Sequence, residues 1–192
     1  MFRGDSIRVV HPLFQTEGSG STPTSPLQLH VGQITVQKAI QLNALWHSRL
    51  PTVIRGNIDR NRHSICFAAE YDGVFYAVAI WSSPVAGLRL TRGEQWLELR
   101  RYAISEDAPK NTASRLLSVM VRLIHRKYPE IVRFISYQDC DSHSGTIYKA
   151  SGWVIGKTVT DTNWGMRRSV HGRIRNIVVA PGKKIRWDLQ ID

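Results

Sequence analysis

Cysteine is rare in this chain, and its scarcity excludes two kinds of site. The 192 residues include two cysteines, Cys66 and Cys140, which do not form a C-x-x-C motif. Disulfide frameworks and cysteine-based zinc sites need more thiols at closer spacing. We therefore expect both thiols to be reduced and to have a structural role.

Long apolar runs are also missing. No stretch approaches the roughly 20 apolar residues of a membrane-spanning helix, and the N-terminal MFRGDSIRVVHPLF lacks the apolar run of a signal peptide. We expect a soluble, cytoplasmic protein without a membrane partner. Hydrophobic residues make up 42% of the chain, which suffices for the core of a single domain.

Acidic residues are too few to balance the basic ones. The chain has 26 Lys and Arg against 15 Asp and Glu, a formal net charge of +11. A surplus of this size in a small domain favours a polyanionic partner, most often nucleic acid. The alternative is a basic, well-solvated surface without such a partner, because charge alone does not identify a ligand.

Part of the surplus is concentrated near the C-terminus. Residues 166–187 contain seven positive side chains and no Asp or Glu. A segment with charges of one sign suits contact with a phosphate backbone. The predicted contact residues are Arg167, Arg168, Arg173, Arg175, Lys183, Lys184 and Arg186.

Hydrophobic periodicity predicts an α/β fold with a mixed sheet. The Asp72-Gly73 dipeptide between two apolar segments is typical of a β-hairpin. In Trp96 to Ser105, alternation sets Leu97, Leu99 and Arg101 against Glu98, Arg100 and Tyr102, as in a strand with two distinct faces. Apolar residues at helical spacing predict helices over 33–50 and 112–128, each ended by a proline. Further strands are predicted at 131–137, 154–159 and 174–179, with a short helix around Tyr148.

Composition divides the chain into three parts. Residues 1–28 include the cluster EGSGSTPTSP and are predicted to form a flexible arm. Residues 29–164 carry the alternating elements and form the predicted catalytic domain. Residues 165–192 form a basic C-terminal segment.

Three places could carry chemistry, and each also has a purely structural reading. At Asn111 to Arg115 a helix begins, so free backbone N–H groups could bind an anion, although these are also ordinary capping residues. Asp139, just after a strand, could face a substrate or cap the next turn. Tyr148 could donate a proton to a leaving group, or pack its ring and hydrogen-bond the backbone.

The segments LELRRYAI, PKNTASRLL and IYKASGW resemble the core of the GNAT superfamily of N-acetyltransferases over about residues 33–160. In that superfamily the helix after the central strand begins with a Gly-rich pyrophosphate loop, and a later helix carries a Tyr followed by a Gly-aromatic pair. Tyr148, Gly152 and Trp153 match the second motif. Where the superfamily has G-x-G/A, this chain has Asn111-Thr112-Ala113. The resemblance implies that the cofactor-binding positions are Asn111, Thr112, Ala113 and Arg115.

A narrower resemblance is carried by LELRRY, PKNTASR and SYQDCDSHSGTIYKASGW. These segments are similar to the phage Mom-type proteins, a divergent acetyltransferase-fold branch that converts adenine in DNA to N6-carbamoylmethyladenine and protects phage DNA from restriction. By position, the resemblance implies catalytic roles for Arg101, Ser114, Asp139 and Tyr148. His47 falls where relatives tend to have a His-Tyr pair, here followed by Ser48, so a metal-binding role for His47 stays open.

The resemblance implies a DNA-modifying transferase in the cytoplasm of a phage host. Its target adenine would be flipped out of the duplex or single-stranded, and its donor would be an acetyl-CoA-like thioester or an aminoacyl-tRNA, which would make tRNA a second partner. Two other functions stay open. One is a GNAT N-acetyltransferase that uses acetyl-CoA on a protein or small amine, and the other is a non-catalytic, basic DNA-binding accessory protein.

Overall fold

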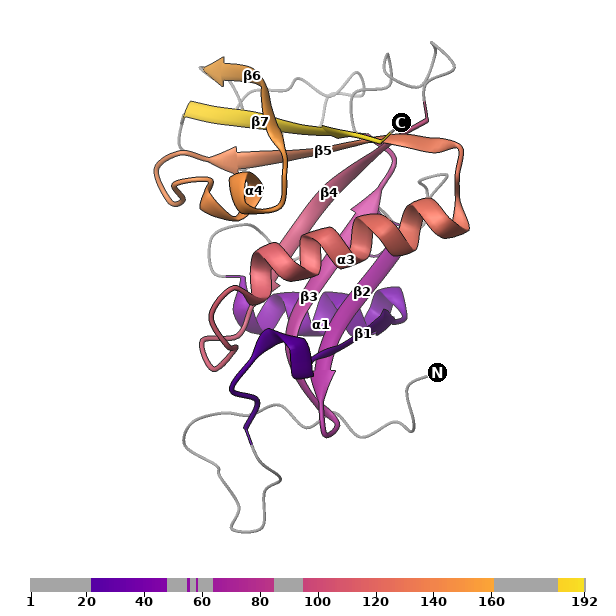
Figure 1. The fold of residues 1–192 in the computed structure, drawn as a ribbon, viewed down its shortest axis with the longest axis vertical. Helices are drawn as coiled ribbons and strands as arrows, with labels where there is room; N and C mark the ends of the chain where they lie inside the picture. Colours follow the sequence, from indigo (N-terminus) through magenta and orange to yellow (C-terminus); the bar gives the residue numbers. More distant parts are fainter. Residues whose placement is uncertain are drawn as a thin grey trace, which may run out of the picture.

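The structure of the protein is a computed structural model, which describes residues 22–47, 55, 58, 64–84, 95–160 and 183–191. Within these residues seven strands form one sheet in the order β1-β2-β3-β4-β5-β7-β6 (Figure 1). Neighbouring strands are antiparallel except β4 and β5, which are parallel. The strands are β1 (His30–Gln33), β2 (Ser64–Tyr71), β3 (Val74–Ser82), β4 (Gln95–Ile104), β5 (Ile131–Asp139), β6 (Val154–Thr160) and β7 (Lys183–Gln190). The predicted α/β fold with a mixed sheet is confirmed.

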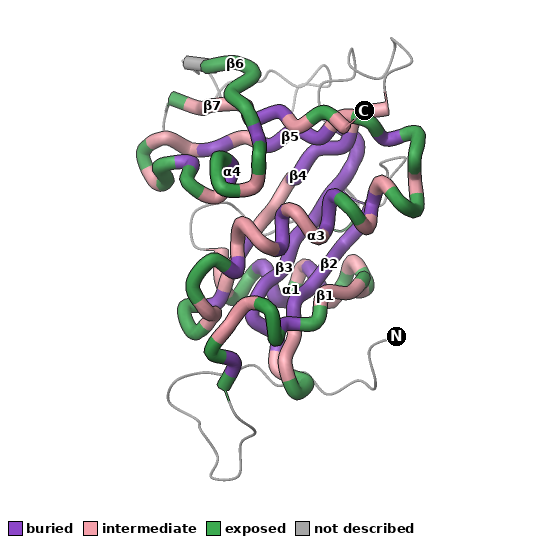
Figure 2. The backbone as a smooth tube through the Cα atoms, viewed as in Figure 1, coloured by how far each residue is buried: buried purple, intermediate pink, exposed green. Residues whose placement is uncertain are grey.

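Helices cover both faces of the sheet. Helix α1 (Val36–Trp46) lies on one face, and α3 (Thr112–Lys127) and the short α4 (Thr146–Ala150) lie on the other (Figure 1). We call these the α1 face and the α3 face. The α3 face holds the larger core, and Figure 2 shows buried backbone along β2, β3 and β4 beneath α3. The buried side chains of α3 recur every three to four residues, as predicted; they include Leu116, Leu117, Met120, Val121 and Ile124.

The β2–β3 hairpin turns at Asp72 and Gly73, as predicted. Both residues have left-handed backbone conformations, with φ of 49° and 79°, as a type I′ turn requires. The preceding edge strand β1 was not predicted, because its short sequence HVGQ shows no apolar alternation. Before it, residues 26–28 of the predicted arm form a 3-10 turn capped by Ser25 and Gln28. The predicted strand at 174–179 lies outside the described residues.

The central strands β4 and β5 pair only along their first halves. Their register joins Gln95–Leu99 to Ile131–Ser136. Beyond it β4 continues against β3 as far as Ile104, whereas β5 continues against β7 as far as Asp139. The two strands therefore part after Leu99 and Ser136 (Figure 1). We call this place the sheet opening.

A bulge in β4 marks the sheet opening. Trp81 pairs with Leu99 and Ile80 pairs with Arg101, so Arg100 has no cross-strand partner in β3. An extra residue of this kind shifts the following side chains to the other face. Tyr102 consequently packs with the α3-face core, whereas Arg101 is in register with Ile80 of the α1-face core. The predicted sharing of one face by Leu97, Leu99 and Arg101 is wrong for this reason.

Strand β7 corrects the predicted division of the chain. Residues 165–192 were predicted to be a basic extension, yet β7 lies inside the sheet between β5 and β6. Its Ile185, Trp187 and Leu189 belong to the α3-face core. The segment looked like a basic extension because every second residue of a strand points away from the core, and in β7 Lys184 and Arg186 occupy such positions. The other predicted boundaries stay predictions.

Every helix in the described part of the chain is too short or too polar to span a lipid bilayer.

Deleting residues 183–192 should prevent folding, because it removes the strand that pairs with both β5 and β6 and exposes the core around Trp187. We expect loss of the cooperative thermal transition seen by circular dichroism. Lys183→Gln, at an exposed position of the same strand, should leave that transition in place. A truncated protein that still melts cooperatively would show that β7 is dispensable to the fold.

Candidate active site

Tyr148 lies at the sheet opening. Its hydroxyl is 2.8 Å from the hydroxyl of Ser136, the last residue of β5 in register with β4. Its ring stacks on Trp187 with the centroids 5.2 Å apart, and meets the edge of Trp153 at 5.7 Å. Packing and one side-chain hydrogen bond thus hold the hydroxyl where the two central strands separate.

Burial raises the pKa of Tyr148, and the hydrogen bond with Ser136 partly opposes this rise. The phenol therefore stays protonated at neutral pH and is able to donate a proton. The two readings of Tyr148 from the sequence, packing residue and proton donor, are both compatible with this position.

The turn before α4 is fixed by side chains of β5 and β7. The Trp187 indole N–H donates to Gln138 Oε1 at 2.7 Å, and the Gln138 amide donates to the carbonyl of His143. Gly145 precedes α4 with a left-handed φ of 75°. A Cβ atom at Gly145 would clash with Gln138 and lie 2.6 Å from the Trp187 ring. Glycine is therefore required here for both its backbone angle and its size.

The start of α3 keeps a geometry suited to an anion. Asn111 precedes the helix with a left-handed φ of 67°, a conformation that Asn tolerates better than most non-glycine residues. Among the described residues, no acceptor bonds the backbone N–H groups of Ala113 and Ser114. The Ser114 hydroxyl donates to the carbonyl of Asn111 at 3.3 Å, and Arg115 has a buried Nη1 without a hydrogen-bond partner. The Asn111-Thr112-Ala113 sequence thus leaves free N–H groups at the helix start.

Tyr102 joins this helix start to the sheet opening. Its hydroxyl donates to the carbonyl of Ala113 at 2.6 Å, and burial and then nearby Tyr148 raise the pKa of Tyr102 well above its ordinary value. Tyr148, Tyr102 and the first turn of α3 therefore form one group on the α3 face. Sequence reasoning missed Tyr102 because the bulge at Arg100 hid which face it occupies.

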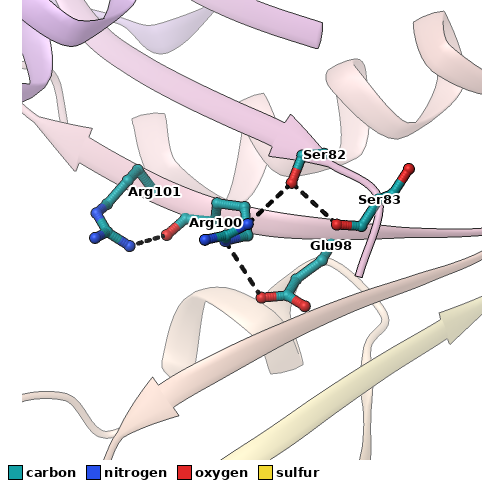
Figure 3. Close-up of polar contacts among 5 residues, drawn as sticks. All are labelled: Ser82, Ser83, Glu98, Arg100 and Arg101. Carbon is teal, nitrogen blue, oxygen red and sulfur yellow. Dashed lines mark hydrogen bonds and ion pairs between the residues drawn. The ribbon is translucent and has the colours of Figure 1, made fainter. Parts of the chain in front are cut away.

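A second group of side chains lies on the α1 face. Arg101 donates through Nη1 to the carbonyl of Arg100 at 2.8 Å, while its buried Nε has no hydrogen-bond partner (Figure 3). His47, at the end of α1, has a buried Nδ1 that likewise has no hydrogen-bond partner. Burial lowers the pKa of His47, and the nearby charges of Arg101 and His143 lower it further. His47 is therefore neutral at neutral pH.

Glu98 orders the arginines around it (Figure 3). This buried carboxylate lies 3.6 Å from Arg100 Nε, and Arg100 also donates to the Ser82 hydroxyl at 3.3 Å. Burial, followed by the charge of Arg100, lowers the pKa of Arg101, and Glu98 opposes the shift. An arginine stays charged even so. No sequence pattern singled out Glu98, which is one acid within an alternating strand.

Asp139 closes β5. Ser136 and Gln138 point towards Tyr148 and Trp187, so alternation turns Asp139 to the α1 face. Its carboxylate accepts hydrogen bonds from the Asp141 N–H and the Ser142 hydroxyl, both at 3.1 Å. The His143 N–H donates to the carbonyl of Asp139 at 3.1 Å, which links this residue to the His47 group. Asp139 thus caps its own turn.

The predicted nucleic-acid contacts are only partly described. Arg167, Arg168, Arg173 and Arg175 lie outside the described residues. Lys183 is exposed, and Lys184 is directly opposite Asp139 in the β5–β7 register. Arg186 binds the buried Asp188 at 2.8 Å. Its charge is therefore largely engaged within the fold.

The metal role considered for His47 gains no support from the side chains around it. Among the described residues, no group of three or more His, Cys, Asp or Glu side chains could hold a metal ion.

Comparison with known sequences assigns the chain to a family. The sequence model of the Mom protein family matches residues 72–188, which run from the β2–β3 turn through β3, both central strands, α3, α4 and β6 to Asp188 in β7. The chain belongs to the Mom protein family. A search of curated proteins found no match.

Several solved structures similar in fold to this Mom-family chain are acetyltransferases. The ribosomal-protein-S18-alanine N-acetyltransferase from Escherichia coli has 11% identity and a TM-score of 0.58, covering 85% of this chain and 94% of its own. A GNAT acetyltransferase from Streptococcus pneumoniae has 10% identity and a TM-score of 0.59, covering 85% of this chain and 99% of its own. A Salmonella typhimurium acetyltransferase with acetyl-CoA has 12% identity and a TM-score of 0.57, covering 86% of this chain and 95% of its own. The Mom-family chain therefore has the fold of the GNAT acetyltransferases.

Gly145→Ala should destabilise this Mom-family protein much more than Gly152→Ala. Both glycines have positive φ, but a Cβ at Gly152 has no atom within 4 Å. Gly152→Ala should therefore cost only the left-handed backbone term of about 1–2 kcal/mol, whereas the clash at Gly145 should add at least about 1–3 kcal/mol. Urea unfolding measures both values. Equal losses would show that the Gln138–Trp187 contact does not constrain this turn.

The lowered pKa of His47 predicts a loss of stability in acid. The unfolded chain protonates His47 at a higher pH than the folded protein does, so the stability contributed by the neutral imidazole is present above the ordinary histidine pKa and lost as the pH falls. Urea unfolding of wild type and His47→Gln from about pH 7.5 to 5 should show the steeper loss in wild type. Parallel curves would contradict the burial of His47.

Proposed function

We propose that this Mom-family protein transfers an acyl-type group to N6 of adenine in DNA, and that the final product is N6-carbamoylmethyladenine. The observation that carries the proposal is the Tyr148 hydroxyl at the sheet opening, beside Ser136, in a chain matched by the Mom family over residues 72–188. A proton donor there would have the free N–H groups of α3 on its own side of the sheet and Arg101 on the other.

The two groups of side chains suit two partners. On the α3 face, the N–H groups of Ala113 and Ser114, with Arg115, suit the phosphates of a donor. On the α1 face, Arg101, Asp139 and the neutral His47 suit the polar edge of a base. The reacting atoms would meet at the sheet opening, between the two groups.

Adenine N6 is a weak nucleophile, because its lone pair is delocalised into the ring. In the proposed step Asp139 accepts the N6 proton while the new bond to nitrogen forms. Arg101, whose Nε is buried without a partner, stabilises the oxyanion that develops on the donor carbonyl. Tyr148 protonates the leaving group as the bond between that group and the carbonyl breaks.

A base inside a duplex cannot reach these side chains, so the target adenine is flipped out or single-stranded. Lys184 lies beside Asp139 on the α1 face, where it would contact a flanking phosphate. The basic residues of the C-terminal segment would add further phosphate contacts, which makes binding strongly salt-dependent.

The site fits a phosphate-bearing donor despite the missing glycines, because Asn111 adopts the left-handed conformation itself. A coenzyme A thioester would supply an activated carbonyl there, held through Ala113, Ser114 and Arg115. An aminoacyl ester of RNA would supply the same carbonyl. A glycyl group and a carbamoylmethyl group are isomers, so glycyl transfer followed by an intramolecular rearrangement balances every atom of the product.

DNA from cells that express the protein should contain a modified adenosine, detected by nucleoside mass spectrometry. Asp139→Ala and Tyr148→Phe should reduce its yield by at least about 100-fold, in line with the contribution of a positioned acid or base. Tyr148→Phe keeps the ring contacts with Trp187 and Trp153, so its loss of activity would isolate the hydroxyl.

Asp139→Asn is the matched control for the capping role of Asp139. Its amide oxygen can still accept from the Asp141 N–H, but it is uncharged and a poor proton acceptor. Low activity in both Asn and Ala variants supports the proposal. An active Asn variant would reduce Asp139 to a turn-forming residue, and unmodified adenine in cells with abundant folded wild type would overturn the proposed reaction.

A further inference from the structure

Helix α3 carries a second concentration of positive charge. From Ala108 to Pro129 the chain has no Asp or Glu. Three arginines of the helix, Arg115, Arg122 and Arg126, are spaced seven and four residues apart. With Lys110 before α3 and Lys149 on α4, they make up what we call the α3 basic face.

The arginine spacing places the three side chains on one stripe of the helix. Separations of seven and four residues return close to the same helical direction, and the stripe is about 16 Å long at 1.5 Å per residue. Arg122 and Arg126 are exposed, as are Lys110 and Lys149, and Arg115 is half-buried. Figure 2 shows exposed and intermediate stretches along α3.

Ordinary helix stabilisation accounts for only part of this charge. Basic residues in the last turn complement the helix dipole, which explains Arg126. It does not explain Arg115 in the first turn, where a positive charge is unfavourable. The Arg122 Nε donates to the Ser118 carbonyl of its own helix at 3.2 Å. No acidic side chain within the described residues forms an ion pair with Arg115, Arg122 or Arg126.

The position of the stripe selects its partner. It starts at the helix end where the N–H groups of Ala113 and Ser114 are free, and it shares the α3 face with Tyr148. Under the proposed function this is the donor side of the sheet, whereas Arg101, Asp139 and Lys184 mark the DNA side. The arginine stripe and the anion site at the start of α3 are continuous on the donor side. A polyanion that binds both would be a nucleic acid that carries the donor.

We infer that the α3 basic face docks the body of an RNA that carries the acyl donor as an aminoacyl ester at its end. This inference rests on the proposed function and specifies its donor. The arginine stripe contacts successive phosphates of the RNA, and its terminal phosphate reaches the start of α3. The acyl carbon then lies at the sheet opening beside Tyr148.

The test compares RNA and DNA binding by the purified full-length protein. Fluorescence anisotropy would measure the affinity for deacylated tRNA and for a short DNA duplex over a series of salt concentrations. In Arg122→Glu/Arg126→Glu, affinity for tRNA should fall at least about tenfold and the salt slope should become shallower by roughly 2, because each lost phosphate contact removes about 0.9. Affinity for the duplex should stay within about twofold.

Two further variants control for folding and position. Arg122→Gln/Arg126→Gln introduces no negative charge near the helix end and should show the same selectivity with a smaller loss. Lys38→Glu reverses a charge on α1, at the opposite face of the sheet, and should leave tRNA affinity unchanged. Thermal melting confirms that each variant is folded.

The outcomes separate this inference from the proposed reaction. Selective loss of tRNA binding supports it. Equal loss of tRNA and duplex binding, no loss of either, or a wild type that does not bind tRNA would overturn it, even if adenine modification in cells is observed. Absence of modified adenine would overturn the proposed reaction, whatever the binding data show.

Discussion

The structure depends on the place where β4 and β5 stop sharing hydrogen bonds. Parallel pairing ends at Leu99 and Ser136, and the bulge at Arg100 turns the rest of β4. Without this parting the two central strands would be continuous neighbours, and no side chain could reach between them. Because they part, Tyr148 contacts the last paired residue of β5. Because the bulge precedes them, Tyr102 lies on the α3 face and Arg101 on the α1 face. Both groups of candidate residues are therefore consequences of one interruption in the sheet.

Strand β7 makes the C-terminal part of the chain a component of the site. Trp187 stacks on Tyr148 and donates to Gln138, which in turn holds the turn before α4. On the other face of the same strand, Asp188 lies 2.8 Å from Arg186 and 3.7 Å from Arg133, whose guanidinium lies 4.1 Å from the Trp96 ring centroid. These arginines stabilise the fold, since a buried carboxylate needs such partners. Net charge alone thus overstates how many basic residues are available to a partner.

The two-sided arrangement bears on the competing functions. A non-catalytic DNA-binding protein has no need for a buried tyrosine hydroxyl at the sheet opening, or for free N–H groups at the start of α3. An N-acetyltransferase of the common type accounts for both features, but not for the charge on the outer side of α3 or for the match to the Mom family. The proposed transferase, which would bind nucleic acid on both faces of the sheet, accounts for the tyrosine hydroxyl, the free N–H groups, the charge on α3 and the family match.

The sequence by itself determined the elements whose patterns are local: the Asp72-Gly73 hairpin, the amphipathic α3, the strand predicted at 131–137 and the short helix with Tyr148. It also supplied the motifs by which the family is recognised. Tertiary structure alone decided which face each residue of β4 occupies, because one bulged residue reverses the alternation without changing composition. It decided that β7 is an internal strand, since its partners are more than 20 residues distant in the chain. It also brought Ser136 and Trp187 into contact with Tyr148 and placed Tyr102 near it, an arrangement that requires strands from distant segments to pair.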